Sequence, residues 1–119
     1  MDIPYFEDRP PKYEESERTY LAEKNSSSLS RAAEYTALAH PLVLAARAFE
    51  KDGKIVLAVL TEPIYLSSER TELKTLLSEE AERETGCEVA LTFDLDIYRR
   101  ISSDMSEETI SLIFKKLKL

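Results

Sequence analysis

Residues 42–66, LVLAARAFEKDGKIVLAVLTEPIYL, carry the strongest local signal in the chain. Two runs rich in aliphatic residues flank the pair Asp52-Gly53, which suits the positive φ angles of a type I′ turn. The stretch therefore predicts a β-hairpin with these two residues as its turn. In this register Lys51 lies opposite Lys54. The pairs that follow outward are Phe49 with Val56, Arg47 with Ala58 and Ala45 with Leu60.

The register separates the side chains of the hairpin into two faces. One face combines small alanines with larger aliphatic residues, so helices can approach it closely, and we expect it to face the core. Its members are Ala46, Ala48, Ile55, Leu57 and Val59. The second face is rather apolar for a surface in contact with water, and its members are Arg47, Phe49, Val56, Ala58 and Leu60. We predict that Phe49, Val56 and Leu60 form an interaction surface.

Helical patterns lie on both sides of the hairpin. Residues 29–41, LSRAAEYTALAHP, place small side chains on one face, which favours close packing on a sheet. Residues 69–86, ERTELKTLLSEEAERETG, repeat leucines at helical spacing, with Ser67 or Ser68 as the expected N-cap. Gly86 suits the left-handed position just past the end of that helix.

A strand and a last helix complete the pattern. Residues 88–93 alternate in polarity and predict a third strand, and Asp104 or Ser106 can cap a helix over the following apolar stripe. The order is then α-β-β-α-β-α. We predict an α+β fold: a two-layer sandwich in which a three-stranded sheet, the hairpin plus a crossover strand, carries helices on one face. If the third strand lies beside the first, the crossover joins these two as parallel neighbours.

The stretch CEVALTFDLDIYRRI, residues 87–101, holds the main candidate for chemistry. Asp94 and Asp96 follow the third strand and could hold a hard cation or act as an acid/base pair. The EF-hand spacing and a glycine-rich phosphate loop are both missing, and the chain has only 2 glycines. The simpler interpretation makes Asp94 an N-cap that accepts from the N–H of Asp96 or Ile97, while the helix dipole favours Asp96 in the first turn. We therefore expect no metal site, no cofactor and no enzymatic activity.

The remaining reactive residues give no stronger motif. One cysteine, Cys87, excludes an internal disulfide, and together with one histidine, His40, it cannot form a typical structural zinc site. A Ser/His/Asp arrangement would lack the Gly-x-Ser-x-Gly elbow.

The composition limits the partners. With 119 residues, 43% hydrophobic residues and a net charge of −7, the chain has the size of one soluble domain and lacks the basic clusters that nucleic acids or anionic membranes attract. No apolar run approaches the roughly 20 residues of a membrane-spanning helix. The sequence shows no signal peptide and no lipid-acceptor cysteine, so we expect a cytoplasmic location without direct membrane insertion.

The first part of the chain differs from the rest. Residues 1–25 hold three of the 5 prolines and seven acidic against four basic residues. We expect a flexible acidic arm there, with a segment that docks through its aromatic residues as the alternative. Residues 26–119 are expected to form a single α+β domain.

Two functions are compatible with these patterns. The first is a non-catalytic interaction or assembly module that binds a protein partner or itself, edge-on or through the apolar second face. The second is a small acidic inhibitor-like regulatory protein. In that case the negative helix of residues 69–86, including Glu79 and Glu80, would bind a basic partner.

The segments SRAAEYTALAHP, LVLAARAFEKDGKIVLAVL, ELKTLLSEEAERETG and CEVALTFDLDIYRRI lie between residues 28 and 101. In this order they resemble the small α-β-β-α-β domain of YhcN/YlaJ-type sporulation lipoproteins. They are also similar to the ring-building motif of secretion-system and sporulation-channel rings. The resemblance implies a non-enzymatic assembly domain, associated with the envelope or forespore of a spore-forming bacterium. The chain departs from the lipoproteins because it lacks their leader and lipid-bearing cysteine, and the resemblance assigns no site residues.

Overall fold

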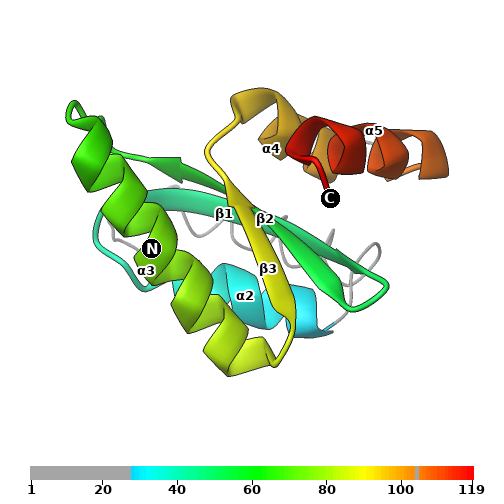
Figure 1. Cartoon of the computed structure of the whole chain (residues 1–119), viewed down its shortest axis with the longest axis horizontal. Coiled ribbons are helices and arrows are strands. Elements are labelled where there is room, and N and C mark those ends of the chain that lie inside the picture. The colour runs from blue at the N-terminus through cyan, green and yellow to red at the C-terminus, as the bar shows by residue number, and fades with distance from the viewer. Residues whose placement is uncertain (1–27, 104) are drawn as a thin grey trace, which may run out of the picture.

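The computed structural model describes residues 28–103 and 105–119, whose arrangement is shown in Figure 1. Its elements are α2 (Ser28–Leu38), β1 (Val43–Lys51), β2 (Lys54–Thr61), α3 (Ser67–Thr85), β3 (Glu88–Thr92), α4 (Leu95–Ser103) and α5 (Glu107–Leu117). The predicted α+β class and order of elements are confirmed, with α4 as the short helix that follows the third strand. The predicted arm, residues 1–25, lies outside the described residues.

The hairpin forms in the predicted register. Strands β1 and β2 are antiparallel, with Lys51 opposite Lys54 and Phe49 opposite Val56. Both turn residues have positive φ, 55° at Asp52 and 79° at Gly53, as a type I′ turn requires. The strand register could be predicted from the sequence because Asp52 and Gly53 favour this turn.

The third strand lies beside β2, at the opposite edge of the sheet from β1. It runs parallel to β2, with Val89 opposite Ile55, and the strand order is β1-β2-β3. The arrangement in which the third strand neighbours the first is therefore not the one formed. A physical reason lies at the outer edge of β1, where the Ala48 N–H donates to Glu34 of α2 at 2.8 Å.

Helices α2 and α3 cover the face that the sequence assigned to the core. Figure 1 shows both helices on the same side of the sheet. Small residues of α2, Ala33 and Ala37, are buried there together with Leu73 and Leu77 of α3. The two-layer sandwich expected from the sequence describes this half of the molecule.

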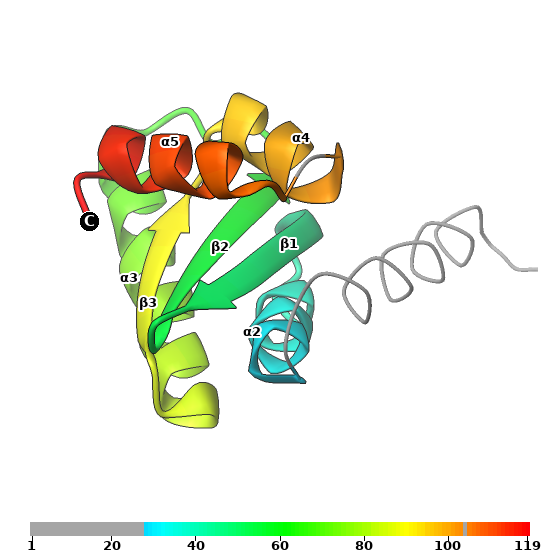
Figure 2. The same cartoon turned by 90° about the vertical axis from the view of Figure 1, so that its right-hand side faces the viewer.

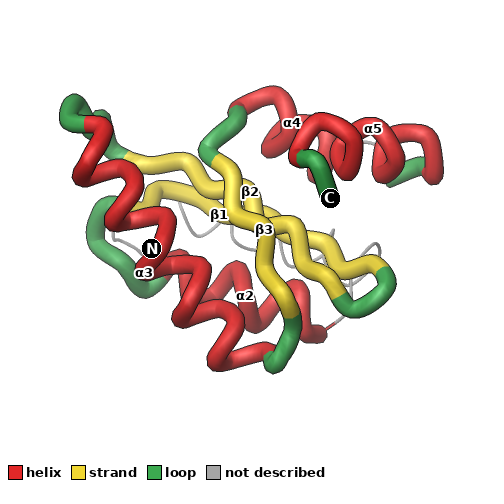
Figure 3. Tube along the Cα trace, viewed as in Figure 1, coloured by secondary structure: helices red, strands yellow, loops and turns green. Residues whose placement is uncertain are grey.

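Helices α4 and α5 form a further layer on the opposite face, as Figures 2 and 3 show. The buried residues of this second cluster are Phe49, Val56, Ala58, Ile97, Tyr98, Ile101 and Ile113. The expectation that helices cover one face only is corrected by this layer. Its physical cause is that α4 places Ile97 and Ile101 on one side of the helix, one turn apart, and this apolar side needs a surface on which to pack.

The N-caps of α3 and α5 were predicted with different success. Helix α5 begins as expected: the side chain of its N-cap, Ser106, accepts from the Thr109 N–H. Helix α3 begins at Ser67, and its N-cap is Leu66, which makes no side-chain cap hydrogen bond. The expected capping role of Ser67 or Ser68 is therefore wrong.

Candidate functional site

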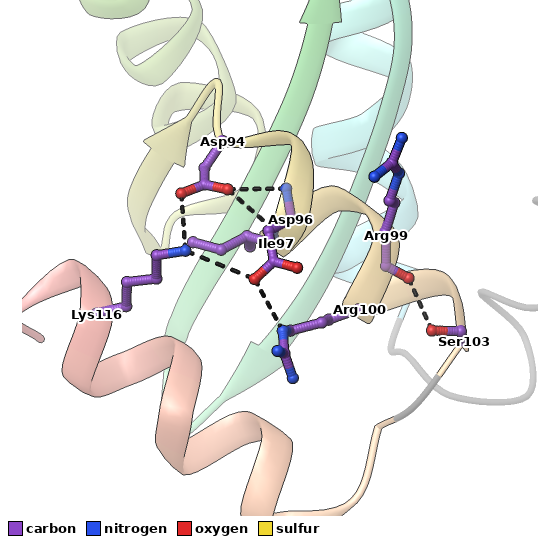
Figure 4. A network of polar contacts seen from close by, with 7 residues as sticks. All are labelled: Asp94, Asp96, Ile97, Arg99, Arg100, Ser103 and Lys116. Atoms are coloured by element: carbon purple, nitrogen blue, oxygen red, sulfur yellow. Dashed lines mark hydrogen bonds and ion pairs between the residues drawn. The ribbon is translucent and has the colours of Figure 1, made fainter.

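The junction between β3 and α4 contains the two aspartates that the sequence singled out (Figure 4). Asp94 Oδ1 accepts hydrogen bonds from the N–H of Asp96 at 2.8 Å and the N–H of Ile97 at 3.2 Å. These are two of the amides that the first turn of α4 leaves without an intrahelical acceptor. The predicted role of Asp94 as N-cap is confirmed.

Asp94 Oδ2 and Asp96 Oδ2 bind cationic side chains. Lys116 Nζ of α5 lies 3.1 Å from Asp94 Oδ2 and 3.6 Å from Asp96 Oδ2, and Arg100 Nε lies 3.0 Å from Asp96 Oδ2. The junction therefore joins α4 to α5 as well as β3 to α4. Figure 4 shows Lys116 reaching across from its own helix.

These contacts shift the ionisation of the junction. The hydrogen bond from Lys116, with the amides of Ile97 and Asp96, lowers the pKa of Asp94 against the opposing effect of desolvation. The hydrogen bond from Arg100 lowers the pKa of Asp96, and the bond to Asp94 raises the pKa of Lys116. All three charges are thus stabilised in the folded protein.

This arrangement suits a structural junction better than a catalytic or metal site. Asp94 and Asp96 direct their oxygens at amides and at the side chains of Lys116 and Arg100. Within residues 28–103 and 105–119, no three His, Cys, Asp or Glu side chains gather in a position to hold a metal ion. Chemically, the junction stabilises the start of a helix.

The residues predicted to form an interaction surface lie mostly inside the protein. Phe49 is 1% exposed and Val56 is fully buried, and Leu60 packs, partly buried, against the same cluster. The Phe49 ring stacks on Phe114 of α5, with centroids 6.1 Å apart. Phe49 and Val56 therefore cannot be the exposed contact surface, because α4 and α5 already cover that face of the sheet.

Arg47 is a charged residue on that face, and its side chain lies against an aromatic ring. Its guanidinium lies 4.2 Å from the centroid of the Tyr98 ring in α4. Its Nε is buried and has no hydrogen-bond partner in the part of the chain that the structure describes. A cation held over the face of a ring is electrostatically favourable, so α4 can cover this charge.

The predicted acidic residues lie on α3, where Glu79 is exposed and Glu80 is half-buried. His40 Nδ1 accepts from the Leu42 N–H at 3.2 Å, in the connection between α2 and β1. Cys87 is a free, partly buried cysteine just before β3. Of these residues, Glu79 is the most accessible to a partner.

The structure adds a group of exposed apolar side chains that the sequence analysis missed. Leu42, Leu44, Tyr65 and Leu66 are 39%, 58%, 89% and 58% exposed, and we call this group the apolar end. The Glu62 N–H donates to the Leu42 carbonyl at 2.9 Å, so both segments lie where β1 begins and β2 ends. The sequence feature that could have predicted Tyr65 and Leu66 as exposed is the run of apolar residues after Pro63, which lies beyond the paired part of the hairpin.

Comparison with known proteins identified no relative: no family model matches the chain, and neither the curated proteins nor the solved structures gave a match. Among the described residues, no helix has both the length and the apolar character needed to cross a bilayer.

Proposed function

We propose that the protein is a non-catalytic interaction module whose contact surface is the apolar end. The observation that carries the proposal is the exposure of Tyr65, 89%, and of Leu66 and Leu44, each 58%, in the two segments that meet where β1 begins and β2 ends. Large apolar side chains that gather at one place on a surface commonly mark a site of protein association. Tyrosine is also among the residues enriched at such interfaces.

The charge of the molecule indicates the kind of partner. A net charge of −7 opposes the approach of a second copy. Exposed Glu62 lies beside the apolar end, and exposed Glu69 follows it in the first turn of α3. We therefore take the partner to be a different protein, with an apolar pocket bordered by basic residues.

The cellular location of this interaction is inferred from the sequence alone. The order of helices and strands that resembles sporulation lipoproteins and ring-building motifs supports assembly at the envelope or forespore of a spore-forming bacterium. A cytoplasmic location remains the prediction for the chain as given. Cell fractionation of a tagged strain, sampled during growth and sporulation, would separate these locations.

The test compares two variants in a quantitative pulldown. Tyr65→Ser combined with Leu66→Ser should reduce recovery of the partner at least about tenfold, because truncated anchor residues typically cost more than 1 kcal/mol. Leu112→Ser is the matched control, since Leu112 is 45% exposed on α5, away from the apolar end. The purified partner should then bind the native protein and the control equally in calorimetry. Equal recovery with all three proteins would contradict the proposal.

A second candidate, an acidic regulatory protein, is favoured by the exposed carboxylates of α3. Besides Glu79, these are Glu69, Glu72, Glu82 and Glu84. In that case Glu79→Gln combined with Glu80→Gln should weaken the complex, and added salt should weaken the native complex as well, because salt screens exposed charges. The Tyr65 and Leu66 variant would then bind normally, which separates the two functions.

A further inference from the structure

Both edges of the sheet carry the same unusual contact, in which a glutamate of a helix accepts from a strand amide. On β1, the Ala48 N–H donates to Glu34 Oε2 of α2 at 2.8 Å. On β3, the Val89 N–H donates to Glu82 Oε2 of α3 at 3.1 Å. Among the residues that the structure describes, β2 lies between the two edge strands. Each of these two edge amides donates to a glutamate and not to β2.

The position of each helix explains how its glutamate reaches the edge. Glu34 lies one helical turn after Ser30, and both side chains are buried on the side of α2 that faces the sheet. Glu82 lies near the end of α3, where Gly86 adopts a left-handed conformation with φ 70°. That turn folds the chain back along the helix, so Val89 passes close to Glu82. Two different local geometries therefore place a glutamate carboxylate beside a strand amide, one at each edge of the sheet.

An edge strand is normally open to another chain. Its outward N–H and C=O groups form a template on which a further strand can pair, and natural proteins protect such edges. A carboxylate that already binds the outward N–H forms a charge-assisted hydrogen bond, stronger than the bond to a neutral carbonyl. It also places negative charge where the carbonyl oxygen of an added strand would have to lie.

We propose that Glu34 and Glu82 close the two edges of the sheet against strand addition by a second copy of the chain. The inference goes beyond the proposed function, because it concerns the sheet edges and not the apolar end. It replaces the edge-on association considered from the sequence. Each edge therefore disfavours extension of the sheet for as long as its carboxylate holds the strand amide.

Sedimentation velocity over a range of concentrations tests the β3 edge. Glu82→Ala should associate at concentrations about tenfold lower than the native protein, as expected for the loss of one charge-assisted hydrogen bond. Glu84→Ala is the matched control: it removes the same charge from an exposed residue of the same helix, and it should behave as the native protein. Glu82→Gln retains an acceptor oxygen and should lie between them. A folded Glu82→Ala protein that sediments like the Glu84→Ala control would overturn the proposal.

Hydrogen exchange of the native protein provides a first measurement that does not require a variant to fold. In the native full chain, the Val89 and Ala48 amides should exchange at least about tenfold more slowly than in the unfolded chain, because each is held by a carboxylate. In Glu82→Ala, the Val89 amide should accelerate about tenfold, and the Ala48 amide should not. A native Val89 amide that exchanges at the rate of the unfolded chain would also overturn the proposal.

Discussion

Asp94 uses its two carboxylate oxygens for different purposes. Oδ1 caps α4 through the amides of Asp96 and Ile97, and Oδ2 binds Lys116 of α5. The first role was predictable, because the N–H groups that can donate to an aspartate between a strand and a helix lie two and three residues ahead of it. The second was not, because Lys116 reaches the site only through the packing of α5, which no local pattern specifies.

Replacing Asp94 should separate these roles. Asp94→Ala removes the cap and the ion pair, so the free energy of unfolding should fall by about 1–2 kcal/mol. Asp94→Asn keeps an oxygen that can cap the helix, and its loss should stay below about 1 kcal/mol. Urea unfolding of both variants provides the measurement. Equal losses would show that the cap contributes little.

Because of the same junction, the free energy of unfolding should depend on pH in the acidic range. The pKa of Asp94 and of Asp96 lies below the ordinary value of 3.8 in the folded protein. Their stabilising contribution is therefore complete above that value and is lost as the pH falls through the lower folded pKa. The raised pKa of Lys116 acts in the opposite range, and its contribution is lost only as the pH rises above 10.5 and through the folded pKa.

A variant with Asp94→Asn and Asp96→Asn provides the pH test. Below pH 3.8 the native protein should lose stability more steeply than the variant, because only the native protein must protonate these two carboxylates. Urea midpoints measured between about pH 2 and pH 6 give both curves. Parallel curves would count against the assigned ion pairs.

At the scale of elements, helices α4 and α5 show how far a sequence pattern reaches. The alternation in β1 and β2 correctly divided their side chains between two faces, and the apolar stripes correctly identified α3 and α5. No pattern stated which helix packs on which face. The second face, with Phe49 and Val56, was therefore taken for an exposed surface, although α5 supplies Phe114 to cover it.

The packing of α5 can be tested with neighbouring residues. Ile113 is 1% exposed and belongs to the second cluster, whereas Leu112 is 45% exposed. Ile113→Ala should lower the free energy of unfolding by about 2–5 kcal/mol, because it leaves a cavity beneath the helix. Leu112→Ala should cost less than about 1 kcal/mol. Similar losses from both substitutions, measured by denaturant unfolding, would mean that α5 does not cover this face.

For the whole molecule, β2 is the element that unites the two layers of helices. Its side chains alternate between the clusters, with Leu57 beneath α2 and α3 and Val56 beneath α4 and α5. The antiparallel pairing with β1 was predictable from Asp52-Gly53. The parallel pairing with β3 was not, because it depends on where α3 returns the chain. The unusual edge contact of Glu34 escaped prediction for the same reason, since a helical pattern does not identify which strand lies alongside.

Because both layers of helices pack on β2, we expect them to unfold together. Leu77→Ala weakens the α3 side and Ile113→Ala weakens the α5 side, yet each variant should show one transition with coincident far-UV circular dichroism and tyrosine fluorescence. In the double variant, the two losses of free energy should add to within about 0.5 kcal/mol, because the sites lie on opposite faces. Separate transitions for the two probes would show that the layers are independent.

The placement of α2 and α5 on opposite faces of the sheet also determines how the protein would respond to mechanical force. A pull applied between these two helices acts across the layers and not along the strands. Helix α5 is held by stacked rings, aliphatic contacts and ion pairs such as that between Lys51 and Glu107, which can be broken one after another. The hydrogen-bonded ladder between β1 and β2 lies within one layer, so this pull does not act directly on its hydrogen bonds. Under tension, α5 should therefore peel away first, and the hairpin should be the last part to yield.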